Sequence, residues 1–181
     1  MEFPADLVIR FARPDDAPTI LAFIRELADF EKLAHEVLAE ESLLRATLFG
    51  VKPAAEVLIA ELGGSGASGF DREPSPVGFA LFFQSYSTFL AKPGLYLEDL
   101  FVRPAARGRG VGGALMSALA RIAVQRNYGR FEWSVLDWNE PALKFYDALG
   151  AKPQSEWTVQ RLTGPALYTL AEQWTVPLGK I

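Results

Sequence analysis

The sequence contains no cysteine and only one histidine, His35. The absence of thiols excludes disulfides, a cysteine nucleophile and zinc sites built on cysteine. A Ser-His-Asp triad would have to use His35, which stands in the polar stretch HEVLAEES with no nucleophile motif nearby. We therefore interpret His35 as a surface residue.

Long hydrophobic segments are also missing. The longest apolar run, residues 77–83 with Gly78 inside it, is far too short to cross a bilayer. The N-terminal stretch MEFPADLVIRF lacks the basic start and apolar core of a signal peptide. We therefore expect a cytoplasmic protein with no membrane partner, and the formal net charge of −4 disfavours a nucleic-acid partner.

The chain of 181 residues, half of them apolar, has the size and composition of one compact globular domain. We expect a single domain over residues 1–181, interrupted by a flexible loop at about 63–76. This stretch, GGSGASGFDREPSP, is rich in glycine, serine and proline and has almost nothing to bury.

Hydrophobic periodicity and turn residues predict the order of the elements. Gly150 follows the fourth helix in the C-cap role. The order indicates an α/β domain with a mixed sheet. The predicted strands cover residues 7–11, 57–62, 77–83, 95–102, 131–136 and 157–162, and the predicted helices cover 17–30, 40–48, 112–125, 141–149 and 166–173.

A glycine-rich stretch, RPAARGRGVGG at 103–113, lies between a predicted strand and a predicted helix. Exposed backbone amides at a helix N-terminus bind phosphate, and glycine lets a ligand approach the main chain. Arg107 and Arg109 add positive charge. A turn without a ligand needs one or two glycines, whereas this stretch has Gly108, Gly110, Gly112 and Gly113.

Two phosphate ligands are compatible with this loop. Gly108, Gly110 and Gly113 satisfy the dinucleotide fingerprint G-x-G-x-x-G, and Glu132 lies near the expected distance for a ribose-binding acid. Three features disfavour an NAD(P)-binding protein. Five residues, 103–107, separate the strand from the first glycine, where that fold turns tightly, and Pro104 stiffens this connection. The chain that follows is too short to build the rest of a nucleotide-binding sheet. This interpretation is kept as the alternative.

The other pattern is R-x-x-G-x-G, formed by Arg107, Gly110 and Gly112. With it the sequence resembles the GNAT superfamily of N-acetyltransferases. The segments ELADFE, LYLEDLFV, RGRGVG and WNEPALKFYDALGA resemble the diamine (spermidine/spermine) and thialysine acetyltransferases in particular. The resemblance implies the acyl-CoA N-acyltransferase fold, an α/β sandwich with a mixed twisted sheet flanked by helices.

The resemblance also implies acetyl-CoA as cosubstrate, no metal, a homodimer, and a small amine acceptor such as a polyamine or a lysine-like amine. A noncatalytic acyl-CoA-binding module and a protein lysine acetyltransferase remain alternatives. The residues that would hold the cofactor are Leu100, Phe101, Val102, Arg107, Gly108, Arg109, Gly110, Val111, Gly112, Gly113 and Asn139.

Two carboxylates, Glu98 and Asp99, stand inside an otherwise apolar predicted strand. Burying a charge is costly unless it is paired, so either the acids are exposed on an edge strand or they serve chemistry. An alkylamine is protonated at neutral pH and must lose a proton before it attacks a thioester. The resemblance makes Glu98 the general base, and partial burial would raise its pKa. Regular alternation would place Tyr96, Glu98 and Leu100 on one face and Asp99, as a supporting residue, on the other.

Asn139 precedes Glu140-Pro141 as a helix N-cap, and Tyr146 lies two helical turns further on the same face. A cap and a core tyrosine are the ordinary interpretations. The resemblance instead makes Tyr146 the general acid for the CoA thiolate and lets Asn139 hold the cofactor. For the amine it implicates Phe30, Glu31, Glu98, Glu132 and Glu156. Apolar residues of the C-terminal segment, from Trp157 to Trp174, would supply a dimer interface.

Overall fold

A computed structural model describes residues 3–64 and 72–175 of the chain. It forms two compact units, Met1–Ser134 and Val135–Ile181, and each is described below by itself. The first unit holds the whole sheet and the glycine-rich loop. The second holds the helix that carries Asn139 and Tyr146.

The first unit is built on a five-stranded sheet in the order β1-β2-β3-β4-β5. The first four strands pair antiparallel in sequence, and β5 pairs parallel with β4. The sheet is therefore mixed, as the sequence predicts. Its strands are β1 (Leu7–Phe11), β2 (Glu56–Gly64), β3 (Arg72–Ser87), β4 (Lys92–Val102) and β5 (Phe131–Trp133).

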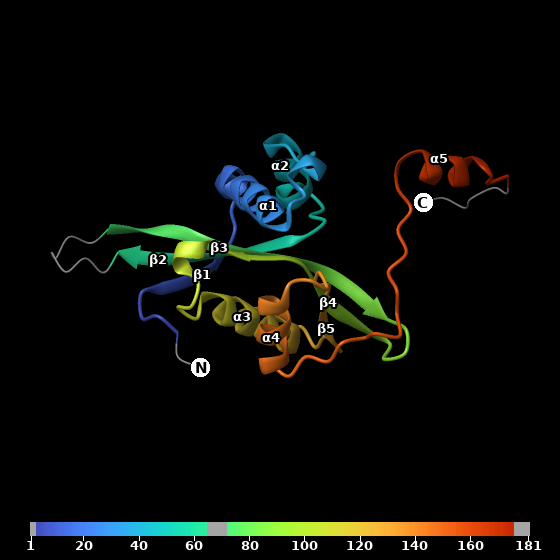
Figure 1. Cartoon of the computed structure of the whole chain (residues 1–181). Helices are drawn as coiled ribbons and strands as arrows, with labels where there is room; N and C mark the ends of the chain where they lie inside the picture. Colours follow the sequence, from blue (N-terminus) through green and yellow to red (C-terminus); the bar gives the residue numbers. More distant parts are fainter. Residues whose placement is uncertain (1–2, 65–71, 176–181) are drawn as a thin grey trace. The chain divides into compact units, whose positions relative to one another are not determined.

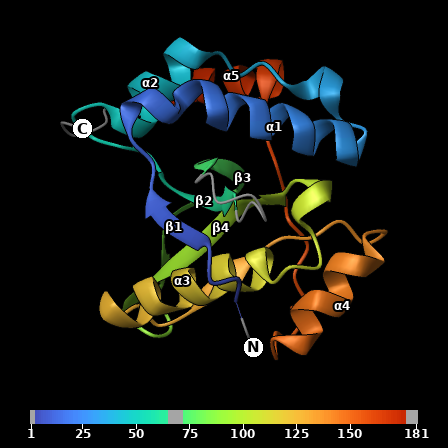
Figure 2. The ribbon, with the colours of Figure 1, turned by 90° about the vertical axis from the view of Figure 1, so that its left-hand side faces the viewer.

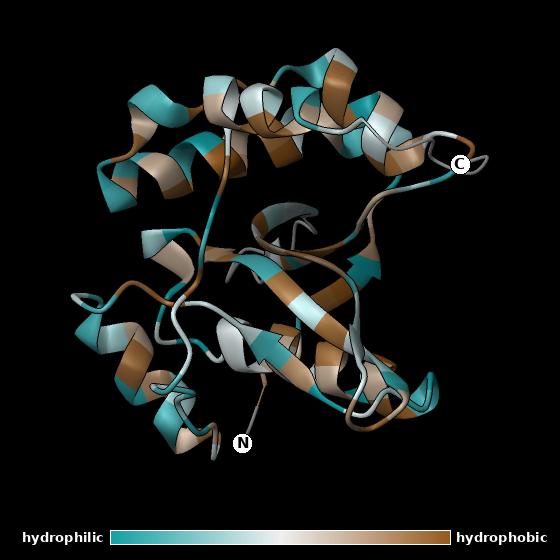
Figure 3. Ribbon diagram, turned by 90° about the vertical axis from the view of Figure 1, so that its right-hand side faces the viewer, coloured by the Kyte–Doolittle hydropathy of each residue, from teal (hydrophilic) through white to brown (hydrophobic). Residues whose placement is uncertain are grey.

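Helices cover both faces of this sheet. One face carries α1 (Ala17–Glu31) and α2 (Glu41–Phe49), and the other carries α3 (Val111–Gln125) (Figures 1 and 2). Hydrophobic and hydrophilic residues alternate along these helices (Figure 3), as expected for helices that bury one side. Short 3-10 helices, Pro14–Asp16, Ala34–Glu36 and Pro104–Ala106, precede α1, α2 and α3.

Aromatic side chains form the core beneath α1. Phe23 of α1 stacks on Phe79 of β3 with ring centroids 5.3 Å apart, and Phe101 of β4 lies 6.2 Å from Phe23. All three rings are buried, together with Ile20 and Ile59. Such aromatic pairs add to the free energy gained by burial, and this cluster fixes α1 against the end of β4.

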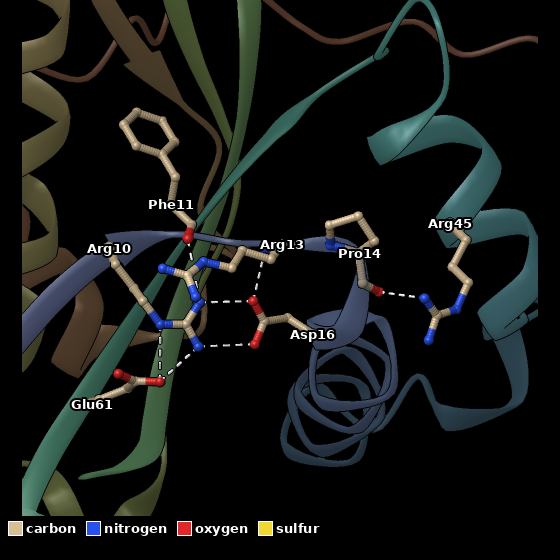
Figure 4. Close-up of polar contacts among 7 residues, drawn as sticks. All are labelled: Arg10, Phe11, Arg13, Pro14, Asp16, Arg45 and Glu61. Atoms are coloured by element: carbon tan, nitrogen blue, oxygen red, sulfur yellow. Dashed lines mark hydrogen bonds and ion pairs between the residues drawn. The ribbon is translucent and has the colours of Figure 1, made fainter.

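A hub of ion pairs, centred on Arg10 of β1, fixes the other end of α1 (Figure 4). Arg10 donates two hydrogen bonds to the Asp16 carboxylate, at 2.7 and 2.9 Å, and Nη2 donates to Glu61 Oε1 at 2.7 Å. The bond from Arg10 holds the pKa of Asp16 below its usual range. Arg45 of α2 donates to the Pro14 carbonyl at 2.6 Å. Sheet, α1 and α2 are thereby joined at the start of α1.

Strand β4 contains one residue more than its partner at Glu98. Leu81 of β3 lies opposite Asp99, whereas the next residue, Phe82, lies opposite Leu97. This is a β-bulge, which leaves the extra residue without a cross-strand partner. Asp99 lies on the face opposite Leu100, as expected, and shares with Phe101 the face that α1 covers. The expected alternation is wrong before the bulge, because Tyr96 lies on the face of Asp99 and not on that of Leu100. Glu98 is exposed at the bulge.

Strand β5 follows β4 only briefly. Its three residues pair with Leu95, Tyr96 and Leu97 of β4, and the rest of β4 extends beyond β5. The prediction of a strand over 131–136 is thus too long. The consequence is an open edge on β4 between Glu98 and Val102.

Two further sequence predictions need correction. The predicted loop at 63–76 is too long, because Gly64 pairs with Arg72 and both strands extend into it; residues 65–71 lie outside the described part of the chain. The predicted strand at 157–162 is wrong: these residues have no regular secondary structure and are exposed. An apolar, β-branched composition alone does not form a strand without a partner strand.

The second unit contains α4 (Glu140–Ala148) and α5 (Gly164–Glu172). Asn139 caps α4, its side-chain oxygen accepting a hydrogen bond from the Ala142 amide at 3.3 Å. Gly150 ends α4 in the left-handed region, with φ +85°, and the Ala151 amide donates back to the Tyr146 carbonyl. Both boundary predictions are confirmed.

Candidate active site

The glycine-rich loop leads from β4 into α3 through two glycines of left-handed backbone. Gly108 has φ +74° and Gly110, the N-cap of α3, has φ +83°. A Cβ built on Gly108 would meet nothing within 4 Å, so the backbone angle, not space, requires glycine there. The loop is therefore held in an open conformation by its own backbone.

The N-terminus of α3 is suited to an anion. Gly110 has no side chain to cap the helix, so the amides of Val111, Gly112 and Gly113 lack the cap that serine or aspartate would provide. Free amides and the helix dipole favour a phosphate at this point. Val111 and Gly113 are buried in the first turn, so their contribution to a ligand would come from the main chain. The loop thus fits the pyrophosphate of acetyl-CoA.

The two arginines of the loop have different surroundings. Arg107 Nε donates to the Val102 carbonyl at 2.9 Å, which ties it to the end of β4. Arg109 Nη2 lies 3.6 Å from Asp6 Oδ2. Both arginines are exposed, so both can reach a phosphate. Arg109 would have to give up its ion pair with Asp6 to do so.

The open edge of β4 adjoins this loop. The Arg103 amide donates to Val77 on β3, so by alternation the main-chain groups of Leu100 and Val102 lie on the edge that β3 does not cover. The Phe101 side chain is buried in the core. Of the three residues predicted to bind the pantetheine arm, Leu100 and Val102 therefore present their main chain where an extended ligand could add to the sheet, whereas the main chain of Phe101 faces β3.

Three carboxylates gather around the bulge. Glu98 is exposed, which overturns the expectation that it is partly buried. The more buried carboxyl is that of Asp99, which is half-buried: burial, then the charges of Glu98 and Glu31, raise its pKa to about 6. Burial also raises the pKa of Glu31 at the end of α1. Glu31 and Glu98 thus lie near enough to Asp99 for their charges to act on its carboxyl, and the three residues are called the acidic cluster below.

The raised pKa of Asp99 predicts a pH-dependent cost in stability. The folded protein binds this proton more tightly than the unfolded chain, so the free energy of unfolding falls as pH rises from about 4 to about 6. We expect Asp99→Asn to stabilise the fold by at most about 3 kcal/mol near neutral pH and to have little effect near pH 4. Urea unfolding at both pH values measures this. An equal effect at the two pH values would contradict it.

The remaining residues predicted for the amine site are less clearly grouped. Glu132 of β5 lies opposite Tyr96 and forms an ion pair with Arg130 Nε at 2.6 Å, so its charge is already partnered. Phe30, next to Glu31 on α1, packs against Arg107, with the guanidinium 4.8 Å from the ring centroid. The structure therefore places Phe30 beside the glycine-rich loop as well as beside the acids.

Three predicted residues belong to the second unit. Asn139 and Tyr146 lie on α4, two turns apart as the sequence predicts, and Tyr146 is half-buried with its ring 5.3 Å from that of Phe145. Glu156 is exposed in the irregular segment between α4 and α5. Within its unit, Tyr146 therefore has the partial burial that suits a residue donating a proton at a site edge.

Sequence reasoning missed one residue near the site, Arg103. Its Nη2 forms an ion pair with Glu26 Oε1 at 2.7 Å, and its guanidinium lies 4.7 Å from the Phe23 ring centroid. The hydrogen bonds that Arg103 donates to Glu26 raise the pKa of the guanidinium further. An arginine directly before Pro104 gives no sequence signal of a distant partner, because the partner lies 77 positions away.

Other kinds of site were also sought in the described residues. Over 3–64 and 72–175, no three His, Cys, Asp or Glu side chains are grouped so that they could hold a metal ion. In the same part of the chain, no helix combines the length and the apolar character needed to cross a membrane.

A mixed sheet with an open β4 edge, followed by a glycine-capped helix, defines the acyl-CoA N-acyltransferase fold. The sequence pattern of the acetyltransferase (GNAT) family matches residues 23–151. The chain belongs to this family and is an N-acetyltransferase.

Curated relatives are similar over nearly the whole chain. The L-ornithine N5-acetyltransferase NATA1 of Arabidopsis thaliana is 38% identical, over 90% of this chain and 86% of its own length. The thialysine N-epsilon-acetyltransferase of Bos taurus is 39% identical, over 92% of this chain and 98% of its own. These relatives match the thialysine and diamine branch that the sequence resembles.

Solved structures support the fold. An integron cassette protein, VCH_CASS6, from the mobile metagenome of V. cholerae aligns with a TM-score of 0.74 and 25% identity, over 94% of this chain and all of that one. An aminoglycoside acetyltransferase, meta-AAC0020, from a soil metagenomic sample aligns with a TM-score of 0.68 and 20% identity, over 90% and 98%. The dinucleotide-binding alternative is therefore set aside.

Proposed function

We propose that the protein transfers the acetyl group of acetyl-CoA directly to a primary amine of a small, lysine-like or polyamine-like molecule. The observation that carries the proposal is the cluster of Glu31, Glu98 and Asp99 at the bulge of β4, next to the open strand edge. Carboxylates in this position favour a cationic acceptor. The names of the relatives, which specify ornithine and thialysine, support the same class.

Acetyl-CoA would supply the reactive thioester. The amides at the start of α3 and the guanidinium of Arg107 would hold its pyrophosphate. The main chain of Leu100 and Val102 would hold the pantetheine arm. Asn139 is assigned to the cofactor as well, as the family resemblance implies.

Two side chains would move protons. Glu98, exposed at the bulge, would accept a proton from the ammonium group, directly or through a water molecule. Tyr146 would donate its phenolic proton to the sulfur of the departing CoA thiolate. Glu31 and Asp99, with Phe30 beside them, would orient the cation, and Glu132 and Glu156 would meet further ammonium groups of a longer amine.

The acceptor class is tested by a panel of amines. We expect thialysine, ornithine, lysine and spermidine to release CoA thiol with lower KM than neutral amines, and added salt to raise their KM because it screens the charges. A lysine-containing peptide is the control for a protein acetyltransferase. If only peptides or neutral amines are acetylated, the acceptor assignment is wrong although the family stands. If none of the amines in the panel causes release of CoA thiol, the acceptor belongs to another chemical class.

We also infer that a second copy of the chain covers the C-terminal segment. Its exposed apolar side chains include Trp157 and Val159, each 75% exposed, and Tyr168 and Trp174. Contiguous apolar surface of this kind marks interaction sites. We therefore propose a homodimer with a cytoplasmic location. The net charge of −4 disfavours a nucleic-acid partner, so none is proposed.

A further inference from the structure

Two arginines of the glycine-rich stretch, Arg103 at its start and Arg107, contact the same helix, α1. Phe23, Glu26 and Phe30 recur along one face of α1, at the spacing of successive turns. Arg103 contacts the first two of these residues, and Arg107 lies over the ring of the third. The helix that carries Glu31 at its end is thus joined to the loop that would bind the cofactor.

Arg107 is held by three contacts that leave part of its guanidinium available. Its Cζ atom lies 4.8 Å from the Phe30 centroid and 5.7 Å from the Phe101 centroid, and Nε donates to the Val102 carbonyl. Within 3–64 and 72–175, the hydrogen bonds and ion pairs of Arg107 use neither Nη1 nor Nη2. The residue is exposed, so these two groups can meet a phosphate.

We propose that Phe30 is a positioning residue for the cofactor: with Phe101, it brackets Arg107 in the pose that receives the pyrophosphate of acetyl-CoA. An arginine side chain has many rotamers, and a pre-organised fork loses less conformational entropy when it binds. The proposal rests on the cofactor site proposed above. Phe30 would then act in cofactor binding before any amine binds. It would also link Glu31, at the end of α1, to the cofactor site.

The bracket predicts a specific pattern of affinities. The Kd of acetyl-CoA is measured by calorimetry without any amine, for the wild type, Phe30→Leu and Phe30→Tyr. Since a cation–π contact at an exposed site is worth about a two- to fivefold change in affinity, Phe30→Leu should raise the Kd by that factor. Phe30→Tyr keeps the ring and should restore the wild-type value. Phe11→Leu changes another half-exposed phenylalanine, on β1, and serves as the matched control.

A double-mutant cycle separates the bracket from a general loss of structure. In an Arg107→Gln background, Phe30→Leu should have no additional effect on the Kd, because the guanidinium that it positions is gone. An unchanged Kd for Phe30→Leu, or an equal loss of acetyl-CoA affinity in both backgrounds, would overturn the role of Phe30. The proposed function would still stand in that case, because the wild type binds acetyl-CoA. Absence of acetyl-CoA binding by the wild type would overturn the cofactor site itself, and the bracket with it.

Discussion

Tyr146→Phe should lower turnover by about 10²–10⁴-fold, the usual contribution of general acid catalysis. The substitution keeps the ring and its contact with Phe145 but removes the proton that Tyr146 would give to the thiolate. The KM for acetyl-CoA should change little, because the hydroxyl acts in the transition state. Release of CoA thiol under saturating substrates measures the turnover.

Tyr86→Phe is the matched control, because it removes the same atom from an exposed tyrosine of β3. We expect this variant to keep wild-type turnover. Circular dichroism and thermal unfolding show whether both variants are folded. A folded Tyr146→Phe protein with normal turnover would remove Tyr146 from the mechanism.

Glu98→Gln should also lower turnover at neutral pH by about 10²–10⁴-fold, because glutamine keeps the shape of glutamate and cannot accept a proton. Part of the turnover should return at high pH, where more of the amine is already neutral. The pH profile of kcat, from neutral to alkaline conditions, measures both effects.

Asp99→Asn provides the comparison at the adjacent position. Asp99 is half-buried and its role would be to bind the cation, so the substitution should act mainly on the KM of the amine and on stability. A Glu98→Gln protein with wild-type turnover and an unchanged pH profile would assign proton removal to water or to another group. A loss of kcat confined to Asp99→Asn would exchange the roles of the two acids.

Much of the fold could be predicted from local patterns. The helical spacing of Ile20, Leu21 and Ile24 predicts α1, and the turn residues before and after α4 predict its two ends. The glycines of the loop predict both the left-handed backbone and the helix that follows. These features depend on neighbouring residues, which the sequence displays directly.

Features that depend on strand pairing could not be predicted in the same way. A bulge arises when one strand has an extra residue relative to its partner, so neither strand alone indicates it. Without the bulge, Glu98 was expected to be the buried acid, whereas burial falls on Asp99. The contact of Arg103 with Glu26 and the short length of β5 are likewise set by residues distant in sequence.

The bulge also determines how this strand would respond to the loss of a residue. Leu97 and Asp99 already lie opposite consecutive residues of β3, Phe82 and Leu81. Deleting Glu98 would therefore close the ladder into regular pairing, with every remaining side chain still on its present face. A one-residue deletion normally moves the side chains on one side of it to the opposite face of the sheet. At this bulge the side chains of β4 would keep their faces. The sheet itself therefore does not require a residue at position 98, whereas the proposed mechanism requires the carboxylate there.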